Sequence, residues 1–291
     1  METILITGIN GFLGSKIAKE LCINYNIIGL EYSTENLFRI NSLNFKVYSY
    51  TTNSIDLIFE ENRVDYIIHA ATVYGRRNDL YSDIIQTNIL MPIRLIELAN
   101  IYQTLAFINI DSFFNDPSIN YKYLSEYTFS KRNFIEWISL MQSHVKVVSL
   151  KIFHLYGPND NKDKFVASII EDLLSGKKAI DLTPGQQMRD FVYIDDVIKA
   201  FKIVLKNISM IKTNFSSIDI GSGVSVSIEE FVTTAKKLTK ASTVLNFGAI
   251  PYRDGEIMHA KADIRKLSNF GWQPEVNVEQ GIAKIINSFK Q

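Results

Sequence analysis

The most constraining feature of this sequence is a glycine-rich turn between an apolar strand and a helix near its start. Residues 3–7 (TILIT) form a continuous apolar run, typical of a strand buried on both faces. In the G-x-x-G-x-x-G loop that follows, the glycines permit a tight turn, close approach to a pyrophosphate, and close helix packing. The loop therefore predicts a dinucleotide site at a helix N-terminus. The loop residues expected to bind the cofactor are Gly8, Asn10, Gly11, Phe12, Leu13 and Gly14.

Strand and helix patterns alternate through the first half of the chain. This order predicts an α/β fold with a Rossmann-type doubly wound parallel sheet. After residue 153 the pattern loosens, and Ser227 is a plausible N-cap for a helix over 228–239. We expect a dinucleotide-binding domain over 1–153, onto which a segment of about 189–220 packs back, and a smaller C-terminal α+β substrate lobe over 154–291. The further strands are expected at 26–30, 45–48, 66–69, 106–110, 145–152 and 217–220, and helices at about 53–60, 81–102, 123–142 and 163–175.

Charge and cysteine content narrow the class of protein. The 31 basic and 31 acidic residues balance, so no net charge attracts nucleic acid or an anionic membrane surface. Cys22 is the single cysteine, which excludes an intramolecular disulfide, and no apolar run approaches the length of a membrane span. We expect a cytoplasmic protein with no nucleic-acid partner, no membrane partner and no metal site.

Glu31, at the end of the second predicted strand, bears on which dinucleotide binds. A carboxylate at this place accepts hydrogen bonds from the adenosine ribose hydroxyls and repels a 2′-phosphate, so it favours NAD(H). Arg39 could approach a 2′-phosphate, which keeps NADP(H) as the alternative. A solvated carboxylate after a strand is the other interpretation of Glu31.

Tyr127 and Lys131 form a Y-x-x-x-K pattern at the start of a helical stretch. Residues four apart share one face of a helix, so the Lys131 charge is expected to lower the pKa of Tyr127 towards neutrality, as proton transfer at a carbonyl requires. Ser112, after the strand at 106–110, supplies a hydroxyl to the same site, unless it serves only a turn or cap. Asp111 competes for that position, but its charge would oppose a developing alkoxide.

Together these residues resemble the extended short-chain dehydrogenase/reductase family, the nucleotide-sugar epimerases, dehydratases and reductases, over nearly the whole chain. The resemblance implies catalysis by Ser112, Tyr127 and Lys131, with Lys131 also holding the cofactor ribose. Ala70 and Ala71 are similar to the family's cofactor-lining segment. The late segments Arg189–Asp196 (RDFVYIDD) and Arg253–Glu256 (RDGE) match family signatures, and imply that Arg189 and Arg253 contact the diphosphate of a nucleotide sugar. A homodimer through the helices near 81–102 and 123–142 is implied as well.

Other segments resemble the branch of this family that contains the CDP-paratose and CDP-abequose synthases. They are Tyr74-Gly75-Arg76, Asn88–Arg94 and Asp163-Lys164-Phe165, with His154 where most of the wider family has asparagine. The branch implies NAD(P)H-dependent reduction of the 4-keto group of a CDP-3,6-dideoxyhexose for surface polysaccharide such as the lipopolysaccharide O-antigen. It is usually associated with NADPH, whereas Glu31 favours NADH. The substrate contacts implied are Tyr74, Arg76, His154, Phe165, Arg189 and Arg253.

Other activities stay open from the sequence. An NAD-dependent nucleotide-sugar 4-epimerase would use the same residues and return the hydride to its substrate. A 4,6-dehydratase needs an acid/base pair beside the catalytic hydroxyl, but Ser112 is followed by Phe113 and Phe114, which disfavours it. A non-catalytic dinucleotide-binding regulator would not need Ser112, Tyr127 and Lys131 together.

Overall fold

A computed structural model describes residues 1–76, 79–115 and 124–290 of the chain. The described residues divide into two compact units. Unit 1 holds residues 1–115, 124–151 and 204–218, and unit 2 holds residues 152–203 and 219–290.

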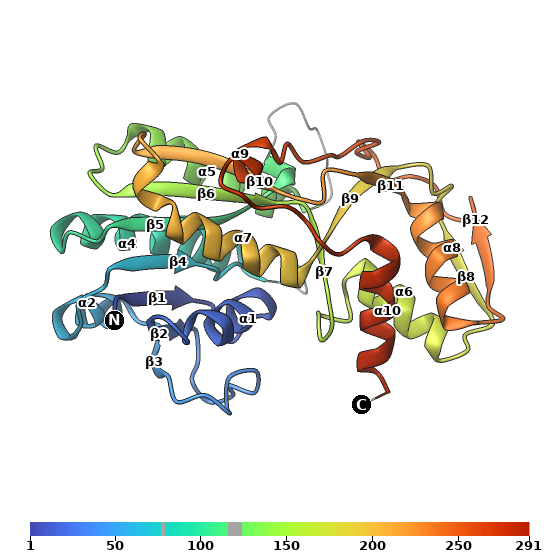
Figure 1. Cartoon of the computed structure of the whole chain (residues 1–291), viewed down its shortest axis with the longest axis horizontal. Coiled ribbons are helices and arrows are strands. Elements are labelled where there is room, and N and C mark those ends of the chain that lie inside the picture. Colours follow the sequence, from blue (N-terminus) through green and yellow to red (C-terminus); the bar gives the residue numbers. More distant parts are fainter. Residues whose placement is uncertain (77–78, 116–123, 291) are drawn as a thin grey trace. The chain divides into compact units, whose positions relative to one another are not determined.

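The main sheet has seven strands in the order β10-β6-β5-β4-β1-β2-β3 (Figure 1). The pairs β1–β2, β2–β3, β1–β4 and β4–β5 are all parallel. The chain runs outward from β1 to β3 and then returns to β4 on the other side of β1, so the sheet is doubly wound. The predicted α/β fold class is confirmed. The strands are β1 (Thr3–Thr7), β2 (Asn26–Glu31), β3 (Lys46–Ser49), β4 (Tyr66–His69), β5 (Ala106–Ser112), β6 (Lys146–Ile152) and β10 (Phe215–Ile220).

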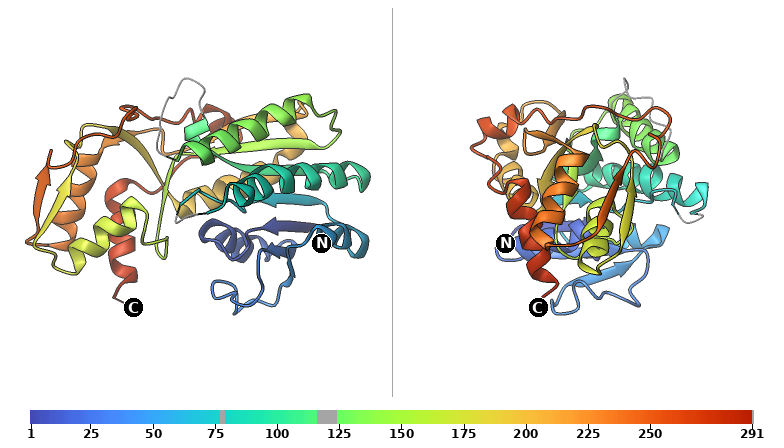
Figure 2. Two further views of the ribbon diagram at one scale, coloured as in Figure 1. Left: turned by 180° about the vertical axis from the view of Figure 1, so that it is seen from behind. Right: turned by 90° about the vertical axis from the view of Figure 1, so that its right-hand side faces the viewer.

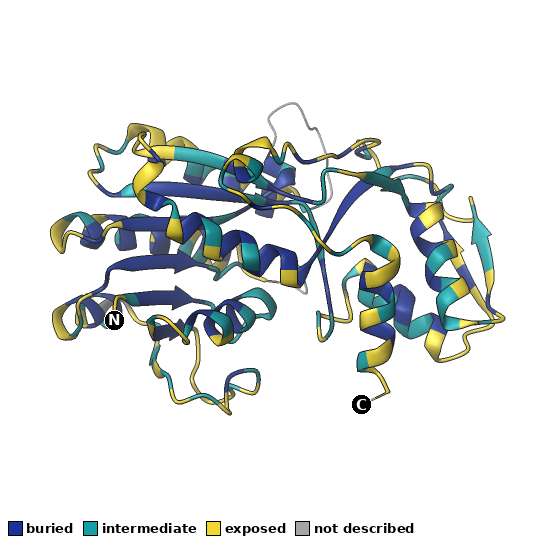
Figure 3. Ribbon diagram, in the orientation of Figure 1, coloured by how far each residue is buried: buried dark blue, intermediate teal, exposed yellow. Residues whose placement is uncertain are grey.

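Helices cover the main sheet because its central strands are apolar on both faces. The helices α2 (Thr52–Glu61), α4 (Met91–Ile101) and α5 (Ser125–Leu140) pack their apolar sides onto one face, in a core that includes Leu5, Ile67 and Phe107. The helix α1 (Phe12–Leu21) lies on the opposite face (Figures 1 and 2). Figure 3 shows the central strands buried along most of their length, as expected for parallel strands between two helical layers.

The region 81–102, predicted as one helix, changes its helix type along its length. It consists of α3 (Tyr81–Ile85), a π-helical turn η1 (Gln86–Leu90) and α4. Asn88 is buried in the π-helical turn, and its side chain bonds outside the helix. A π-helical turn re-aims side chains and is frequent at functional sites. The periodicity of residues 81–102 does not indicate this turn.

Unit 2 has its own small sheets and helices. A three-stranded sheet has the order β11-β9-β7, with β11 antiparallel and β7 parallel to β9, and β8 pairs in parallel with β12. Ser227 accepts a hydrogen bond from the Glu230 N–H, which confirms it as the N-cap of α8. The remaining elements are η2 (Phe113–Asn115) and η3 (Ile208–Met210) of unit 1, α7 (Ile194–Lys206), which runs from unit 2 into unit 1, and, in unit 2, β7 (His154–Tyr156), α6 (Phe165–Leu174), β8 (Ala179–Leu182), β9 (Met188–Tyr193), β11 (Ser225–Ser227), α8 (Ile228–Thr239), β12 (Val244–Phe247), α9 (Arg265–Asn269) and α10 (Val278–Ser288).

Aromatic rings form the centre of unit 2. Phe191 of β9 stacks on Phe231 of α8, with ring centroids 4.2 Å apart, and Tyr156 meets both rings edge-on. Gly281 lets α10 lie against this cluster, because a Cβ there would be 2.0 Å from the Tyr156 hydroxyl oxygen. This core gives β7 and β9 fixed positions, and both strands carry predicted substrate contacts.

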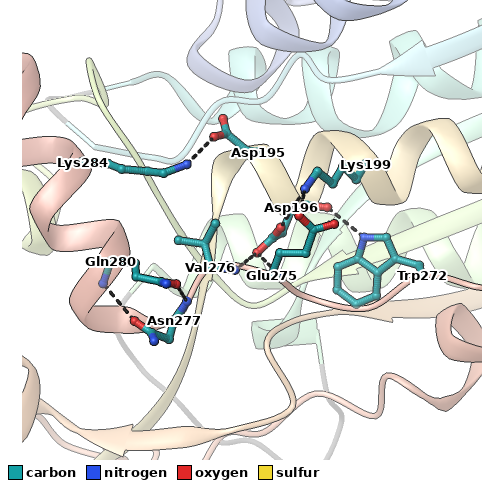
Figure 4. A network of polar contacts seen from close by, with 9 residues as sticks. All are labelled: Asp195, Asp196, Lys199, Trp272, Glu275, Val276, Asn277, Gln280 and Lys284. Carbon is teal, nitrogen blue, oxygen red and sulfur yellow. Dashed lines mark hydrogen bonds and ion pairs between the residues drawn. The ribbon is translucent and has the colours of Figure 1, made fainter.

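Asp196 ties the C-terminal segment to α7 (Figure 4). Its Oδ2 accepts the N–H groups of Glu275 and Val276 over 3.1 and 2.9 Å, and its carbonyl oxygen accepts the Trp272 indole N–H over 3.0 Å. Lys284 of α10 also pairs with Asp195 over 3.2 Å. These contacts lie within unit 2. They show that Asp195 and Asp196, the last two residues of the RDFVYIDD segment, stabilise the fold.

Within the described ranges, no group of three or more His, Cys, Asp or Glu side chains is arranged to hold a metal ion. The helices of these ranges are too short or too polar to cross a membrane.

Candidate active site

The glycine loop packs so closely against the backbone around it that Gly8 and Gly14 could not carry side chains. Gly8 has a φ of +65°, and a Cβ there would be 2.7 Å from the Ala71 nitrogen. A Cβ on Gly14 would be 2.1 Å from the Gly8 carbonyl oxygen. Gly11 is the N-cap of α1 and has no side chain that could cap the helix. The N-cap residue therefore does not cover the positive end of the helix dipole, which favours an anion. The loop therefore fits the pyrophosphate of a dinucleotide.

Glu31 lies where the sequence places it, at the end of β2 beside the glycine loop. Its Oε1 accepts the Asn10 N–H, and burial raises its pKa above the ordinary value, although this hydrogen bond lowers it. Asn10 also binds the following loop, since its Oδ1 accepts the Arg39 N–H over 3.0 Å and its Nδ2 donates to the Asn36 carbonyl over 3.0 Å. The Arg39 guanidinium donates to the Asn10 carbonyl over 3.4 Å. Both residues that bear on cofactor choice are thus held through Asn10.

The end of β4 is tied to the end of β1 by one hydroxyl group. Thr7 Oγ1 lies 2.8 Å from His69 Nδ1 and accepts the Ala71 N–H over 3.1 Å. Burial lowers the pKa of His69 well below its ordinary value, and the Lys131 charge lowers it further, so this imidazole is neutral. The arrangement holds Ala70 and Ala71 against Gly8, as the cofactor-lining role predicted for them requires.

The three predicted catalytic residues come together in unit 1. Ser112 is the last residue of β5, and Tyr127 and Lys131 lie one turn apart in α5. All three are buried, and the Ser112 hydroxyl is within hydrogen-bonding reach of the Tyr127 phenol. Lys131 Nζ lies 6.0 Å from the centre of the Tyr127 ring and donates to the Ile110 carbonyl over 2.8 Å. Such a group of a phenol, a hydroxyl and an ammonium suits proton transfer at a carbonyl oxygen.

The pKa of Tyr127 differs from the sequence prediction. Burial raises it well above the ordinary value, and Tyr74 and Asp111 raise it further, while the Ser112 hydrogen bond and the Arg76 charge lower it. Burial also lowers the pKa of Lys131 to about 8, and Asp111 opposes that shift. The predicted lowering of the Tyr127 pKa is therefore wrong for this structure, because the lost solvation of the phenolate outweighs the Ser112 hydrogen bond and the Arg76 charge.

Tyr74 and Arg76 lie beside Tyr127, the predicted catalytic tyrosine. The rings of Tyr74 and Tyr127 have centroids 4.9 Å apart, and the Arg76 guanidinium lies 5.4 Å from the centre of the Tyr74 ring. Gly75, with a φ of +69°, makes the turn between them. Of the predicted substrate contacts, these two are the ones that unit 1 places next to the predicted catalytic residues.

Asn88 joins the loop after β4 to α5. Its Nδ2 donates to the Val73 carbonyl over 2.8 Å and to Ser130 Oγ over 2.9 Å, and its Oδ1 accepts the Val73 N–H over 2.9 Å. Ser130 Oγ in turn donates to the Tyr127 carbonyl over 2.8 Å. The sequence indicates Asn88 only through the family resemblance. It does not indicate Ser130, whose position inside Y-x-x-x-K carries no signal of its own.

The predicted substrate contacts of unit 2 differ in exposure. His154 meets the Phe191 ring edge-on at 5.5 Å, and burial lowers its pKa to about 3, so the imidazole is neutral. Phe165, the first residue of α6, is partly exposed, and Arg253 is exposed. Arg189 is buried, where its guanidinium pairs with Glu256 and donates to the carbonyls of Met188 and Ile257. The roles of these four residues in substrate binding stay predictions.

Comparison with known proteins gives a consistent result. Residues 4–221 match the model of the NAD dependent epimerase/dehydratase family. The chain is 32% identical to a CDP-abequose synthase of Salmonella muenchen, over 98% of this chain and 97% of that protein. It is 30% identical to a CDP-abequose synthase of Salmonella typhimurium, with the same shares of the two chains covered. The crystal structure of UDP-glucose 4-epimerase with UDP-glucose, from Thermotoga maritima, superposes with a TM-score of 0.86 at 23% identity, over 99% of this chain and 98% of that one.

The family match spans the glycine loop, Glu31 and the three residues Ser112, Tyr127 and Lys131. The fit of the loop to a pyrophosphate and the carboxylate at the end of β2 agree with the NAD dependence of the family. The chain is an NAD-dependent enzyme of the short-chain dehydrogenase/reductase type, and it belongs to the NAD dependent epimerase/dehydratase family.

Proposed function

We propose that this enzyme reduces the 4-keto group of a nucleotide-linked deoxy sugar, of the CDP-3,6-dideoxyhexose type, with NADH. The observation that carries the proposal is the buried group of Ser112, Tyr127 and Lys131 in a chain similar to two CDP-abequose synthases over 98% of its length. The product would serve surface-polysaccharide synthesis in the cytoplasm, where nucleotide sugars and reduced dinucleotides are available together.

The residues of the site divide the reaction between them. Bound NADH supplies the hydride that reaches the carbonyl carbon. Tyr127 donates its phenolic proton to the carbonyl oxygen, which becomes the new hydroxyl group, and Ser112 hydrogen-bonds that oxygen while its negative charge develops. The raised pKa of Tyr127 keeps the phenol in its protonated form. Lys131 holds a positive charge near the Tyr127 ring and would bind the ribose of the dinucleotide.

Cofactor choice rests on Glu31. The carboxylate is fixed by the Asn10 N–H, so a ribose that binds beside it finds an acceptor for its hydroxyl groups. A 2′-phosphate at the same place would lie against a negative charge. The Arg39 guanidinium also contacts the Asn10 carbonyl and stacks on Phe38, with its centre 4.5 Å from the ring centroid. These contacts support NADH as the reductant, with NADPH as the weaker alternative.

The substrate's diphosphate is best matched by Arg253. This side chain is exposed, and a guanidinium group binds phosphate oxygens in pairs. Arg189 is held by Glu256 and two backbone carbonyls, so a diphosphate would have to compete with a buried ion pair for it. The neutral imidazole of His154 offers the sugar one donor and one acceptor. Tyr74, Arg76 and Phe165 complete the proposed substrate contacts.

A homodimer is part of the proposal. Phe129, Trp137 and Leu140 of α5 are exposed apolar residues on one side of the helix, and α3, which packs against α5, adds Tyr81 and Ile85. A second copy of the same surface would cover them. Sedimentation of the purified protein tests this, and Trp137→Lys is expected to shift the dimer to monomer.

The decisive experiment offers the purified protein NADH or NADPH with a panel of nucleotide-linked 4-keto sugars. Oxidation of one NADH for each sugar reduced, fastest with a CDP-linked 3,6-dideoxyhexulose, is the expected result. Isomer formation without net oxidation of the cofactor would overturn the proposal. That result would favour an NAD-dependent 4-epimerase, the alternative supported by the fold shared with the Thermotoga maritima enzyme and by the NAD preference attributed to Glu31.

A further inference from the structure

Asn10 of the glycine loop makes contacts that a pyrophosphate cradle does not need. Its side chain reaches the segment after β2, where Nδ2 donates to the Asn36 carbonyl and Oδ1 accepts the Arg39 N–H, both over 3.0 Å. These two groups are three residues apart, so one carboxamide holds both ends of the stretch 36–39. Ile40, the next residue, is buried and anchors the stretch from its other end. The backbone of Arg39 is therefore fixed beside the glycine loop.

The backbone of Asn10 brings two opposite charges close to one another. Its N–H donates to Glu31 Oε1, and its carbonyl oxygen accepts Arg39 Nη1 over 3.4 Å. One residue spans at most about 3.6 Å of chain, so these two side-chain atoms lie no more than about 10 Å apart. The Arg39 guanidinium also lies on Phe38, with its centre 4.5 Å from the ring centroid. A cation is thus held near the carboxylate beside which the adenosine ribose would bind.

We propose that Asn10 positions Arg39 as a binding group for the 2′-phosphate of NADPH, so that the enzyme binds NADPH as well as NADH. Glu31 repels a 2′-phosphate, whereas the guanidinium that Asn10 holds nearby attracts the same group. Asn10 is a positioning residue in this respect, because it acts on the 2′-phosphate through Arg39. The proposal concerns dinucleotide binding alone, so it holds whether or not the enzyme reduces the proposed sugar.

The contacts to Asn10 matter because an arginine side chain is long and flexible. An arginine on a loose loop loses much conformational entropy when it binds a phosphate, whereas one that is already held loses less. The contact between the guanidinium and the Asn10 carbonyl is long, at 3.4 Å, so a phosphate oxygen can replace that carbonyl at little cost. Arg39 is therefore ordered near the ribose and still able to bind a phosphate.

The test measures the dissociation constants of NADH and NADPH by calorimetry, with the full chain at one fixed ionic strength. Arg39→Ala removes the cation, and we expect it to weaken NADPH binding about tenfold and NADH binding less than about threefold. Asn10→Ala removes the carboxamide but keeps the N–H that holds Glu31. It should weaken NADPH binding about fivefold, with as small an effect on NADH. General damage to the glycine loop would instead weaken both dinucleotides alike.

The double variant shows whether Asn10 acts through Arg39. If it does, Asn10→Ala has no further effect in protein that already carries Arg39→Ala, and the double variant binds NADPH as Arg39→Ala does. Two independent contacts would instead multiply to a loss of about fiftyfold. Asn41→Ala is the matched control, because it removes the same kind of side chain from an exposed position two residues beyond Arg39. Both dissociation constants should stay unchanged in this control.

Any of three results would overturn the proposal. They are NADPH binding that Arg39→Ala leaves unchanged, equal losses of both dinucleotides in Asn10→Ala, and a multiplied loss in the double variant. Asn10→Ser, whose hydroxyl is too short to hold both ends of the stretch 36–39, replaces Asn10→Ala if that variant does not fold. These measurements use no sugar substrate. The expected binding constants in a protein that reduces none of the 4-keto sugars would refute the reductase and support the task of Asn10.

Discussion

Buried carboxylates have different tasks in the two units. Asp111 in unit 1 and Asp190 in unit 2 are both nearly inaccessible to solvent, and several donors surround each of them. The donors to Asp111 come from the adjoining residue and from side chains beside the catalytic group. The donors to Asp190 include the N–H groups of Ser222, Gly223 and Ala262, which lie 32 to 72 positions further along the chain.

The difference shows how a buried charge is used. At Asp190 the carboxylate joins distant backbone segments, and its replacement should affect folding. At Asp111 it holds the backbone of Ser112, and its replacement should affect activity. The RDFVYIDD segment looked like a substrate signature from the sequence, but the carboxylates of Asp190 and Asp196 in it bind backbone. The predictions that follow test whether loss of activity and loss of stability separate in this way.

The largest effect is expected at Tyr127, the proposed proton donor. Tyr127→Phe removes the proton donor and keeps the ring that lies against Tyr74, so turnover should fall about 10³-fold in single-turnover assays. The free energy of unfolding should change by less than about 1 kcal/mol.

Tyr66→Phe is the matched control for this change. Tyr66 is equally buried in the main sheet, but its hydroxyl donates to Glu2 over 3.3 Å at the other end of β4, so full turnover is expected. Turnover of Tyr127→Phe above a tenth of the wild-type rate would contradict the role of the phenol. A protein that acts only as a dinucleotide-binding regulator would keep its function in this variant.

The second effect is the loss of the Asp190 anchor. Its two oxygens accept four hydrogen bonds from Ser222, Gly223 and Ala262, and the amide of Asp190→Asn would turn a donor towards at least one of these donors. We expect the free energy of unfolding, measured in urea, to fall by about 3 kcal/mol. A fall below about 1 kcal/mol would mean that the anchor does not hold these segments in solution.

The third effect concerns the cofactor. Glu31→Gln keeps an acceptor for the Asn10 N–H and removes the charge that would face a 2′-phosphate. The ratio of kcat/KM for NADH over NADPH should therefore fall about tenfold, with little change in the rate with NADH. Glu35→Gln, on the exposed loop that follows, is the control. An unchanged ratio would assign cofactor choice to another group, with Arg39 the first candidate.

Local patterns account for what the sequence could predict. The strand β1 was predicted at its observed bounds, and the glycine loop was predicted with the right steric reason, because neighbours along the chain determine both. The short strands β7, β8 and β12 have no pattern of their own and form by pairing with segments far along the chain. The ion pair of Arg189 and Glu256 joins residues 67 positions apart, and no spacing rule indicates it.

The prediction for the pKa of Tyr127 is wrong for a related reason. The Y-x-x-x-K spacing correctly places Lys131 beside the phenol. It does not indicate how deeply the two residues are buried, or that the charges of Asp111 and Arg76 act on the phenol. The depth of burial depends on how the whole unit packs. A motif of five residues can therefore indicate which residues form the site, but not how burial and charge shift their pKa values. Sites of this kind can be located from sequence before their titration can be predicted.

The smallest effect is expected at Asp196, and it sharpens the contrast with Asp190. Only Oδ2 of Asp196 accepts backbone N–H groups, while Oδ1 lies 3.8 Å from the partly exposed Lys199 ammonium. The amide of Asp196→Asn can keep the acceptor and point its donor the other way. We expect the free energy of unfolding at pH 7 to change by less than about 1 kcal/mol, against the larger loss in Asp190→Asn.

The pH dependence of this small change has a definite sign. Burial raises the pKa of Asp196 above its unfolded value, so the folded state binds the proton more tightly than the unfolded state. Its charge therefore costs stability above the folded pKa, and this cost disappears as the pH falls below the unfolded value of about 3.9. Because the amide variant carries no such cost, its stability relative to wild type should be highest at neutral pH and decline in acid. Urea unfolding at pH 7 and below pH 4 measures both differences, and the opposite trend would show that Lys199 and the backbone donors stabilise the carboxylate more than burial disfavours it.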